Sequence, residues 1–168
     1  AAATAVAATT STGTLGNITG DFGKALEMIW ELEGGNTKDG GYVVDTGGPT
    51  RYGITQDNAR IHTGYTGDMR QFPKELAVKT YKDYWNNYGL NDIKGFPLAV
   101  AMYNTVVNSG PARASKFVTR MLGLPESKAG KLKPDWVSAL NAKPAGQAGM
   151  EFINQQDKFY DVLVAQNA

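Results

Sequence analysis

The sequence contains no cysteine and a single histidine, His62. Without thiols, neither a disulfide framework nor a thiolate metal site can form, and the redox compartment stays undecided. One imidazole excludes a zinc site built from several histidines and leaves a serine-type catalytic triad with one possible base. No serine elbow motif accompanies it. We therefore expect no metal site.

Long apolar runs are also missing, so we expect no membrane insertion. The net charge of +1 argues against a polyanion-binding tail. Basic residues nevertheless gather between 113 and 133, where Glu126 is the single acid. This run is either a solvated helix face and loop or a contact for an anionic polymer. Because no recognised nucleic-acid motif accompanies it, we expect no nucleic-acid partner.

At 168 residues, the chain has the length of one ordinary domain with a real core. Its opening, "AAATAVAATTSTGTLGN", is rich in alanine and lacks a basic n-region. Such small side chains bury too little surface to offset the entropy of ordering. We interpret residues 1–20 as a linker or processed N-terminal segment and residues 21–168 as the folded domain.

After this opening, apolar residues recur mostly at helical spacing. We expect a first helix over 21–33, and then a small irregular β-hairpin in "GGYVVDTGGPTRYGIT", which is rich in glycine and β-branched residues. Pro73 is placed to begin the next helix. Further helices are expected over 97–110, 111–122, 134–142 and 147–165. The chain is therefore predicted to be mainly α-helical.

Glu33 is the first candidate for chemistry. It continues, by one further turn, an apolar stripe on the first helix that consists of Phe22, Leu26, Ile29 and Trp30. A carboxyl group that closes such a stripe lies against the core, where loss of solvent raises its pKa. The following glycines, 34 and 35, end the helix and leave room for a ligand. The alternative interpretation is a frayed helix end with a solvated glutamate.

Asn104 and Asn108 lie one turn apart on the apolar helix predicted over 97–110. Buried amides need hydrogen-bond partners. Either both asparagines tie neighbouring loops together, or Asn108, near the helix end, contacts a substrate.

Three ordered segments resemble a known family. "LEGG", "DTGGPTRYGIT" and "YWNNYGLNDIKGFPLAVAMYNTVVNSGPARASKFVTRMLG" are similar to glycoside hydrolase family 108, the phage and bacterial N-acetylmuramidases that cut peptidoglycan. The resemblance spans roughly residues 22 to 124. It implies a lysozyme-like, mainly helical fold, with the small β-hairpin near the catalytic glutamate. The family's glutamate in its Glu-Gly-Gly motif corresponds to Glu33.

The sequence departs from the family pattern at two places. "NTKDGG" stands between Glu-Gly-Gly and Tyr42, so that Asp45 lies further from Glu33 along the chain than in the family. Asn104 occupies a position where the family commonly has aspartate, whereas Asn-Ser-Gly at 108–110 is intact.

Glycoside hydrolysis needs a proton donor and a second group that stabilises charge, attacks the sugar or activates water. We assign the first role to Glu33 and the second to Asp45, whose alternative role is to cap its own turn. Thr50 is a candidate for orienting water, while Tyr42 and Tyr52 are candidates for lining the sugar site. This chemistry needs no metal and no organic cofactor.

The expected function is that of a muramidase acting on bacterial peptidoglycan, from a phage endolysin or a virion-associated lysin. Its expected location is the phage virion or the host periplasm and cell wall. Other virion proteins, bound through the N-terminal segment, are further candidate partners. Two alternatives remain: a lytic transglycosylase, and a non-catalytic wall-binding or structural module with the same fold.

Overall fold

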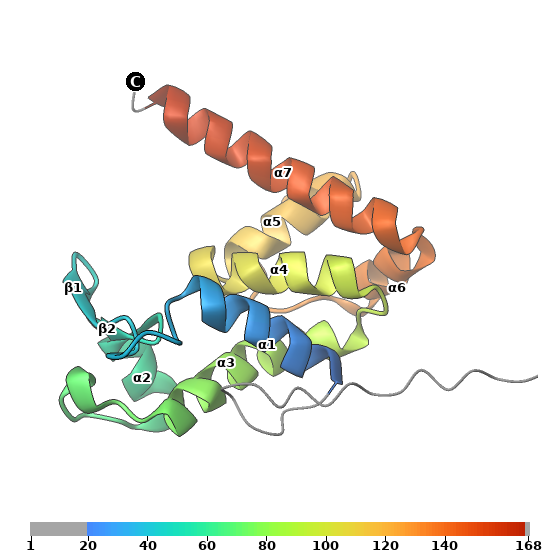
Figure 1. Ribbon diagram of the computed structural model, residues 1–168. Coiled ribbons are helices and arrows are strands. Elements are labelled where there is room, and N and C mark those ends of the chain that lie inside the picture. Colours follow the sequence, from blue (N-terminus) through green and yellow to red (C-terminus); the bar gives the residue numbers. More distant parts are fainter. Residues whose placement is uncertain (1–19, 167–168) are drawn as a thin grey trace, which may run out of the picture. The chain divides into compact units, whose positions relative to one another are not determined.

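The computed structural model describes residues 20–166 (Figure 1). The chain divides into two compact units, residues 1–82 and 83–168, with the division inside one helix. Each unit is described separately. The predicted N-terminal segment, residues 1–20, lies outside the described residues except for Gly20. The prediction of a single domain over 21–168 stays a prediction.

Unit 1 begins with helix α1 (Gly20–Leu32) and continues into an antiparallel sheet with the strand order β1-β2-β3. The strands are β1 (Val43–Asp45), β2 (Gly48–Arg51) and β3 (Ile54–Thr55), and β2 pairs with both neighbours. Helix α2 (Gln56–Thr63) and the 3-10 turn η1 (Met69–Gln71) follow and pack against the sheet. Helix α3 (Lys74–Tyr88) begins in unit 1.

Unit 2 contains the end of α3, the 3-10 turn η2 (Leu90–Asp92) and four helices. These are α4 (Phe96–Ser109), α5 (Pro111–Met121), α6 (Pro134–Ala142) and α7 (Ala145–Gln166). Helices α4, α5 and α7 pack against one another, and the C-terminal end of α7 extends beyond its neighbours (Figure 1). Proline in the first turn begins α4, α5 and α6, where a missing N–H costs nothing.

The predicted fold class is confirmed, because helices dominate residues 20–166 and the β structure is one small sheet. That sheet has a third strand beyond the expected hairpin. Helix α2 is absent from the sequence prediction, since its only buried side chain is Ala59 and it therefore lacks an apolar stripe. Residue types typical of helix ends nevertheless stand at both ends of α2. Thr55 accepts a hydrogen bond from the Asn58 N–H, and Gly64 ends the helix in a left-handed conformation.

The basic run between 113 and 133 belongs to unit 2. Glu126 forms ion pairs with Lys116 at 3.5 Å and with Arg120 at 3.1 Å. Lys128 and Lys131 are exposed, so both interpretations of the run remain open. No helix within residues 20–166 combines the length and apolar character that crossing a membrane requires.

Candidate active site

Glu33 directly follows the last residue of α1, and its N–H donates to the Ile29 carbonyl at 2.9 Å. The stripe that leads to it packs as predicted, because Leu26, Ile29 and Trp30 are almost completely buried. The Glu33 side chain is half-buried, and loss of solvent raises the pKa of its carboxyl group. These observations confirm the stripe interpretation; the catalytic role stays a prediction.

Among the described residues, the Glu33 carboxyl group has no hydrogen-bond or ion-pair partner. Burial alone therefore accounts for the raised pKa. A half-buried acid without a partner retains its proton to a higher pH than an exposed glutamate does. This proton is not donated to another protein group in a hydrogen bond. The group can consequently serve as a proton donor.

The turn between β2 and β3 covers Glu33. A Cβ atom added at Gly53 would lie 2.9 Å from Glu33 Oε2 and 2.6 Å from the Tyr81 hydroxyl oxygen. Gly53 also has φ +72°, a left-handed conformation that favours glycine. Only glycine allows the backbone to approach this close to both side chains.

Tyr52 precedes Gly53 and also adopts a positive φ, +54°. Its N–H donates to the Gly40 carbonyl at 2.7 Å, and its carbonyl accepts from the Tyr81 hydroxyl at 2.7 Å. Its ring stacks on Trp30, with a centroid distance of 4.9 Å and an interplanar angle of 19°. These contacts hold a conformation that is uncommon for a residue with a bulky side chain.

The "GGNTKDGG" segment forms an ordered turn over residues 34–41. Asp39 Oδ1 accepts from the Gly41 N–H at 3.0 Å and from the Thr37 hydroxyl at 3.3 Å, so Asp39 has a local structural role. Gly40 packs so closely on the Tyr52 ring that a Cβ atom there would lie 2.6 Å from it. The inserted residues therefore pack against the turn that covers Glu33.

Arg51 joins three parts of unit 1. Its side chain donates from Nε to the Asp39 carbonyl at 3.0 Å and from Nη1 to the Arg70 carbonyl. The guanidinium carbon also lies 4.9 Å from the centroid of the Tyr52 ring. Arg51 therefore links residues 34–41 and η1 to the strand that carries Thr50.

Asp45 ends β1 and is exposed. Its Oδ1 accepts from the Gly47 N–H at 2.8 Å, so the carboxylate caps the turn between β1 and β2. The sequence interpretation weighed this role against catalysis. The cap is observed, and the catalytic role stays a prediction.

Thr50 is buried on β2, and its hydroxyl donates to the Gly48 carbonyl at 3.3 Å. Tyr42 is half-buried, with the Arg70 guanidinium carbon 5.8 Å from its ring centroid. A hydrogen bond to Tyr42 is the main cause that raises the pKa of the exposed Arg70. The predicted roles of Thr50 and Tyr42 toward water and sugar stay predictions.

Asn108 lies in unit 2, near the end of α4, and is exposed. Its Nδ2 donates to Asn104 Oδ1 at 2.9 Å, so these two amides pair with each other on the helix surface. The predicted substrate contact of Asn108 is untested.

Gly53 and Tyr81 contact the surroundings of Glu33 but were not among the predicted site residues. Tyr81 is completely buried on α3. Gly53 stands inside "RYGIT", where the glycine was a visible signal for a close approach. The contacts of Tyr81 with Tyr52 join residues 29 positions apart, which helical spacing alone does not reveal.

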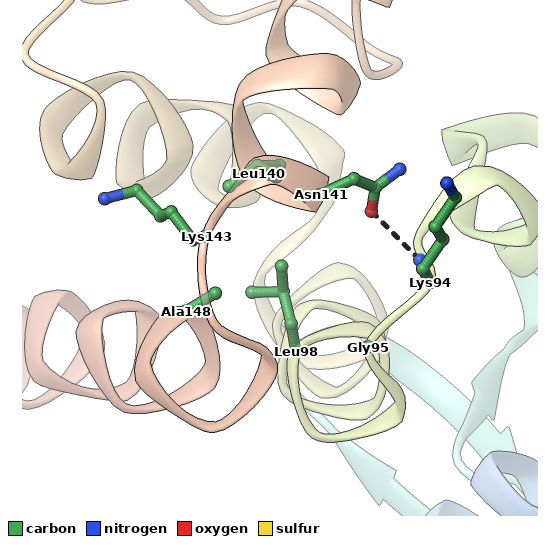
Figure 2. A pocket seen from close by; sticks show the side chains of 7 residues that line it. All are labelled: Lys94, Gly95, Leu98, Leu140, Asn141, Lys143 and Ala148. Atoms are coloured by element: carbon green, nitrogen blue, oxygen red, sulfur yellow. Dashed lines mark hydrogen bonds between the residues drawn. The ribbon is translucent and has the colours of Figure 1, made fainter.

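A separate pocket of about 110 Å³ lies in unit 2, between the start of α4, the end of α6 and the start of α7 (Figure 2). Its interior is formed by Leu98, Leu140 and Ala148, while the ammonium groups of Lys94 and Lys143 point away from it in Figure 2. None of the predicted site residues lines it. Within residues 20–166, no three His, Cys, Asp or Glu side chains gather in a way that could hold a metal ion.

Comparison with known proteins adds a family and a fold. The sequence profile described as Glycosyl hydrolase 108 matches residues 26–110, half of the chain, and this range includes Glu33, Asp45 and Asn108. The structure is similar to that of SagA from Brucella abortus, with a TM-score of 0.69 and 24% sequence identity. That similarity covers 83% of this chain and 79% of the other and concerns the fold. No curated protein matches the sequence.

Proposed function

The chain belongs to glycosyl hydrolase family 108, and from this premise we propose that it cleaves bacterial peptidoglycan between N-acetylmuramic acid and N-acetylglucosamine. The observation that carries the proposal is the state of Glu33. Its carboxyl group is half-buried, and burial raises its pKa. Such a group supplies the proton that the leaving sugar oxygen needs.

In the proposed mechanism, Glu33 protonates the glycosidic oxygen while positive charge develops on the sugar ring. A second group then activates water or attacks the ring. We propose Asp45 for this role, with Thr50 orienting the water and with Tyr42, Tyr52 and Asn108 contacting the substrate. We favour the water route, which gives inverted products and places the carboxyl groups about 6.5 to 9.5 Å apart.

The decisive experiment compares Glu33→Gln with Glu31→Gln on purified peptidoglycan. Glu31 is exposed on α1 and offers the same chemical change at a neighbouring position. General acid catalysis contributes about 100- to 10,000-fold, so Glu33→Gln should lose activity by that factor while Glu31→Gln keeps it. Full activity of a folded Glu33→Gln variant would refute the assignment.

Mass spectrometry of the released muropeptides separates hydrolysis from the alternative, lytic transglycosylation. A hydrolase releases reducing ends that contain an added water, whereas a transglycosylase closes an anhydro ring and adds none. If the wild-type protein released no muropeptides, the alternative of a non-catalytic wall-binding or structural module would replace both. Proton NMR of the earliest products then distinguishes inverted from retained configuration.

The proposed substrate places the site of action in the bacterial periplasm or cell wall, as for a phage endolysin or a virion-associated lysin. Deleting residues 1–16 tests the proposed attachment role of the N-terminal segment. Hydrolysis by the shortened protein should be unchanged. Loss of incorporation into phage particles, with activity kept, would support attachment to other virion proteins.

A further inference from the structure

The β2–β3 turn, which covers Glu33, keeps its backbone conformation only through contacts with other parts of unit 1. Tyr52 and Gly53 have φ values of +54° and +72°, and a bulky side chain at positive φ is strained. Such a conformation persists only where surrounding contacts determine it. The contacts on Tyr52 are the Gly40 carbonyl, the Trp30 ring and the Tyr81 hydroxyl.

Tyr81 is the contact that comes from helix α3. Its side chain is completely buried, and its hydroxyl donates to the Tyr52 carbonyl at 2.7 Å. The same oxygen lies 2.6 Å from the point where a Gly53 Cβ atom would stand, and Glu33 Oε2 lies 2.9 Å from that point. The hydroxyl therefore holds the peptide group that precedes the covering glycine.

We propose that Tyr81 is a positioning residue for Glu33, because its hydrogen bond holds the β2–β3 turn closed so that Gly53 keeps water from the carboxyl group. This inference rests on the proposed function, in which Glu33 is the proton donor. Tyr81 itself touches no reacting atom in this role.

The charged neighbours of Glu33 in unit 1 do not account for its raised pKa. Burial is the sole cause of the raised pKa of Glu33, with no contribution from a charged neighbour. The charged and titratable side chains on the surrounding elements are Asp21, Lys24, Glu27 and Glu31 on α1, Lys38, Asp39 and Tyr42 before β1, Asp45, Arg51 and Tyr52 in the sheet and its β2–β3 turn, and Lys74, Glu75, Lys79, Tyr81 and Lys82 on α3. Arg51 and Asp39 are engaged in hydrogen bonds described above, and Lys74 lies 5.8 Å from the Trp30 ring centroid. Exclusion of water is therefore the property that Tyr81 should control.

The test is the pH profile of kcat/KM for Tyr81→Phe. Without the hydroxyl, the turn opens, water reaches Glu33 and its pKa falls toward the ordinary value. The alkaline limb should move to lower pH, so activity on that limb is lost at a lower pH than in the wild-type protein while activity on the acid side is kept. KM should change little, since Tyr81 is buried. An unshifted limb, or an equal loss at every pH, would overturn the proposal.

Tyr65→Phe is the matched control. The Tyr65 hydroxyl donates to the Asp68 carbonyl at 2.8 Å, so the substitution removes the same kind of hydrogen bond elsewhere in unit 1. Its pH profile should equal that of the wild-type protein. A shift equal to that of Tyr81→Phe would mark a general effect on stability and overturn the positioning role.

A second pair of variants tests the turn without changing Tyr81. Gly53→Ala places a methyl group against Glu33 and Tyr81, whereas Gly48→Ala has the same left-handed backbone, φ +89°, and no neighbouring atom within 4 Å. Both variants place an alanine in a left-handed backbone conformation and share that strain. A shift of the alkaline limb should therefore appear only in Gly53→Ala, where the added methyl group meets Glu33. Equal profiles for the two variants would contradict a closed turn over Glu33.

Direct NMR titration of the Glu33 carboxyl carbon separates this inference from the proposed function. In Tyr81→Phe the Glu33 pKa should fall, whatever the enzyme does to peptidoglycan. If Glu33→Gln remains active but this titration shifts, the proposed function fails and the positioning effect stands. If Glu33→Gln is inactive and the titration does not shift, the positioning effect fails alone.

Discussion

The rings of Trp30 and Tyr52 stack at a centroid distance of 4.9 Å, so the last turn of α1 and the β2–β3 turn meet directly beside Glu33. Trp30 is buried, and its ring also meets Tyr81 edge to face at 6.1 Å. The three aromatic side chains join α1, the sheet and α3 within unit 1. The stack therefore contributes both to stability and to the position of the candidate acid.

Removing the stack should destabilise unit 1. Tyr52→Ala loses the aromatic pair and its buried area, and we expect the free energy of unfolding to fall by about 2–3 kcal/mol in urea titrations. Tyr52→Phe is the control: among residues 20–166 the Tyr52 hydroxyl has no hydrogen bond, so stability should change by less than about 0.5 kcal/mol. Lost activity in stable Tyr52→Phe would indicate a substrate contact. Equal stability of both variants would contradict the role of the stack.

The stability of Glu33→Gln should depend on pH relative to the wild-type protein. The pKa of Glu33 is raised from 4.5 in the folded state, so the folded protein binds its proton more tightly than the unfolded chain. The contribution to stability is present below pH 4.5 and is lost as pH rises through the folded-state pKa. Glutamine does not titrate. We expect equal melting temperatures at about pH 4 and a higher one for Glu33→Gln at neutral pH, by a few degrees at most because solvent still screens a half-buried group.

Calorimetry across this pH range measures that difference. Glu31→Gln is again the control, and its melting temperature should follow the wild-type protein at every pH. A Glu33→Gln advantage that grew on acidification would contradict the raised pKa of Glu33.

Two substitutions at Asp45 separate turn capping from catalysis. Asp45→Asn keeps an oxygen that can accept from the Gly47 N–H, so its unfolding free energy should stay within about 0.5 kcal/mol of the wild-type value. Asp45→Ala loses the cap and should cost up to about 1 kcal/mol. If Asp45 is catalytic, both variants lose most activity. A fully active Asp45→Asn enzyme would show that Asp45 caps the turn and has no catalytic role.

Asn141 should be important for the stability of unit 2. Its Oδ1 accepts from the Lys94 N–H at 3.0 Å and its Nδ2 donates to the Asp92 carbonyl at 2.8 Å, so one amide joins α6 to the segment before α4 (Figure 2). Asn141→Ala should lower the free energy of unfolding by about 1–2 kcal/mol. Asn154→Ala, on an exposed position of α7, should have no measurable effect. Equal urea midpoints for the two variants would contradict the bridging role.

The sequence by itself determined the helical architecture and the position of Glu33. Apolar spacing predicts α1 and α3 to α7, since a helix must bury one face wherever it packs, and proline and glycine mark several of the ends. Glu33 was identifiable because it closes such a stripe at a Glu-Gly-Gly motif. Helix α2 was missed because its stability depends on end caps and on contacts with the sheet rather than on an apolar stripe.

The tertiary structure alone decided what surrounds Glu33. Tyr81 reaches Tyr52 across 29 positions, and Gly53 approaches Glu33 from a turn 20 positions away, as the residue numbers show. No local periodicity encodes such contacts, because they depend on how α1, α3 and the sheet pack together. A glutamate at the end of an apolar stripe can be solvated or shielded. The close approach of a glycine without a side chain, supported by a buried tyrosine hydroxyl, leaves it half-buried here.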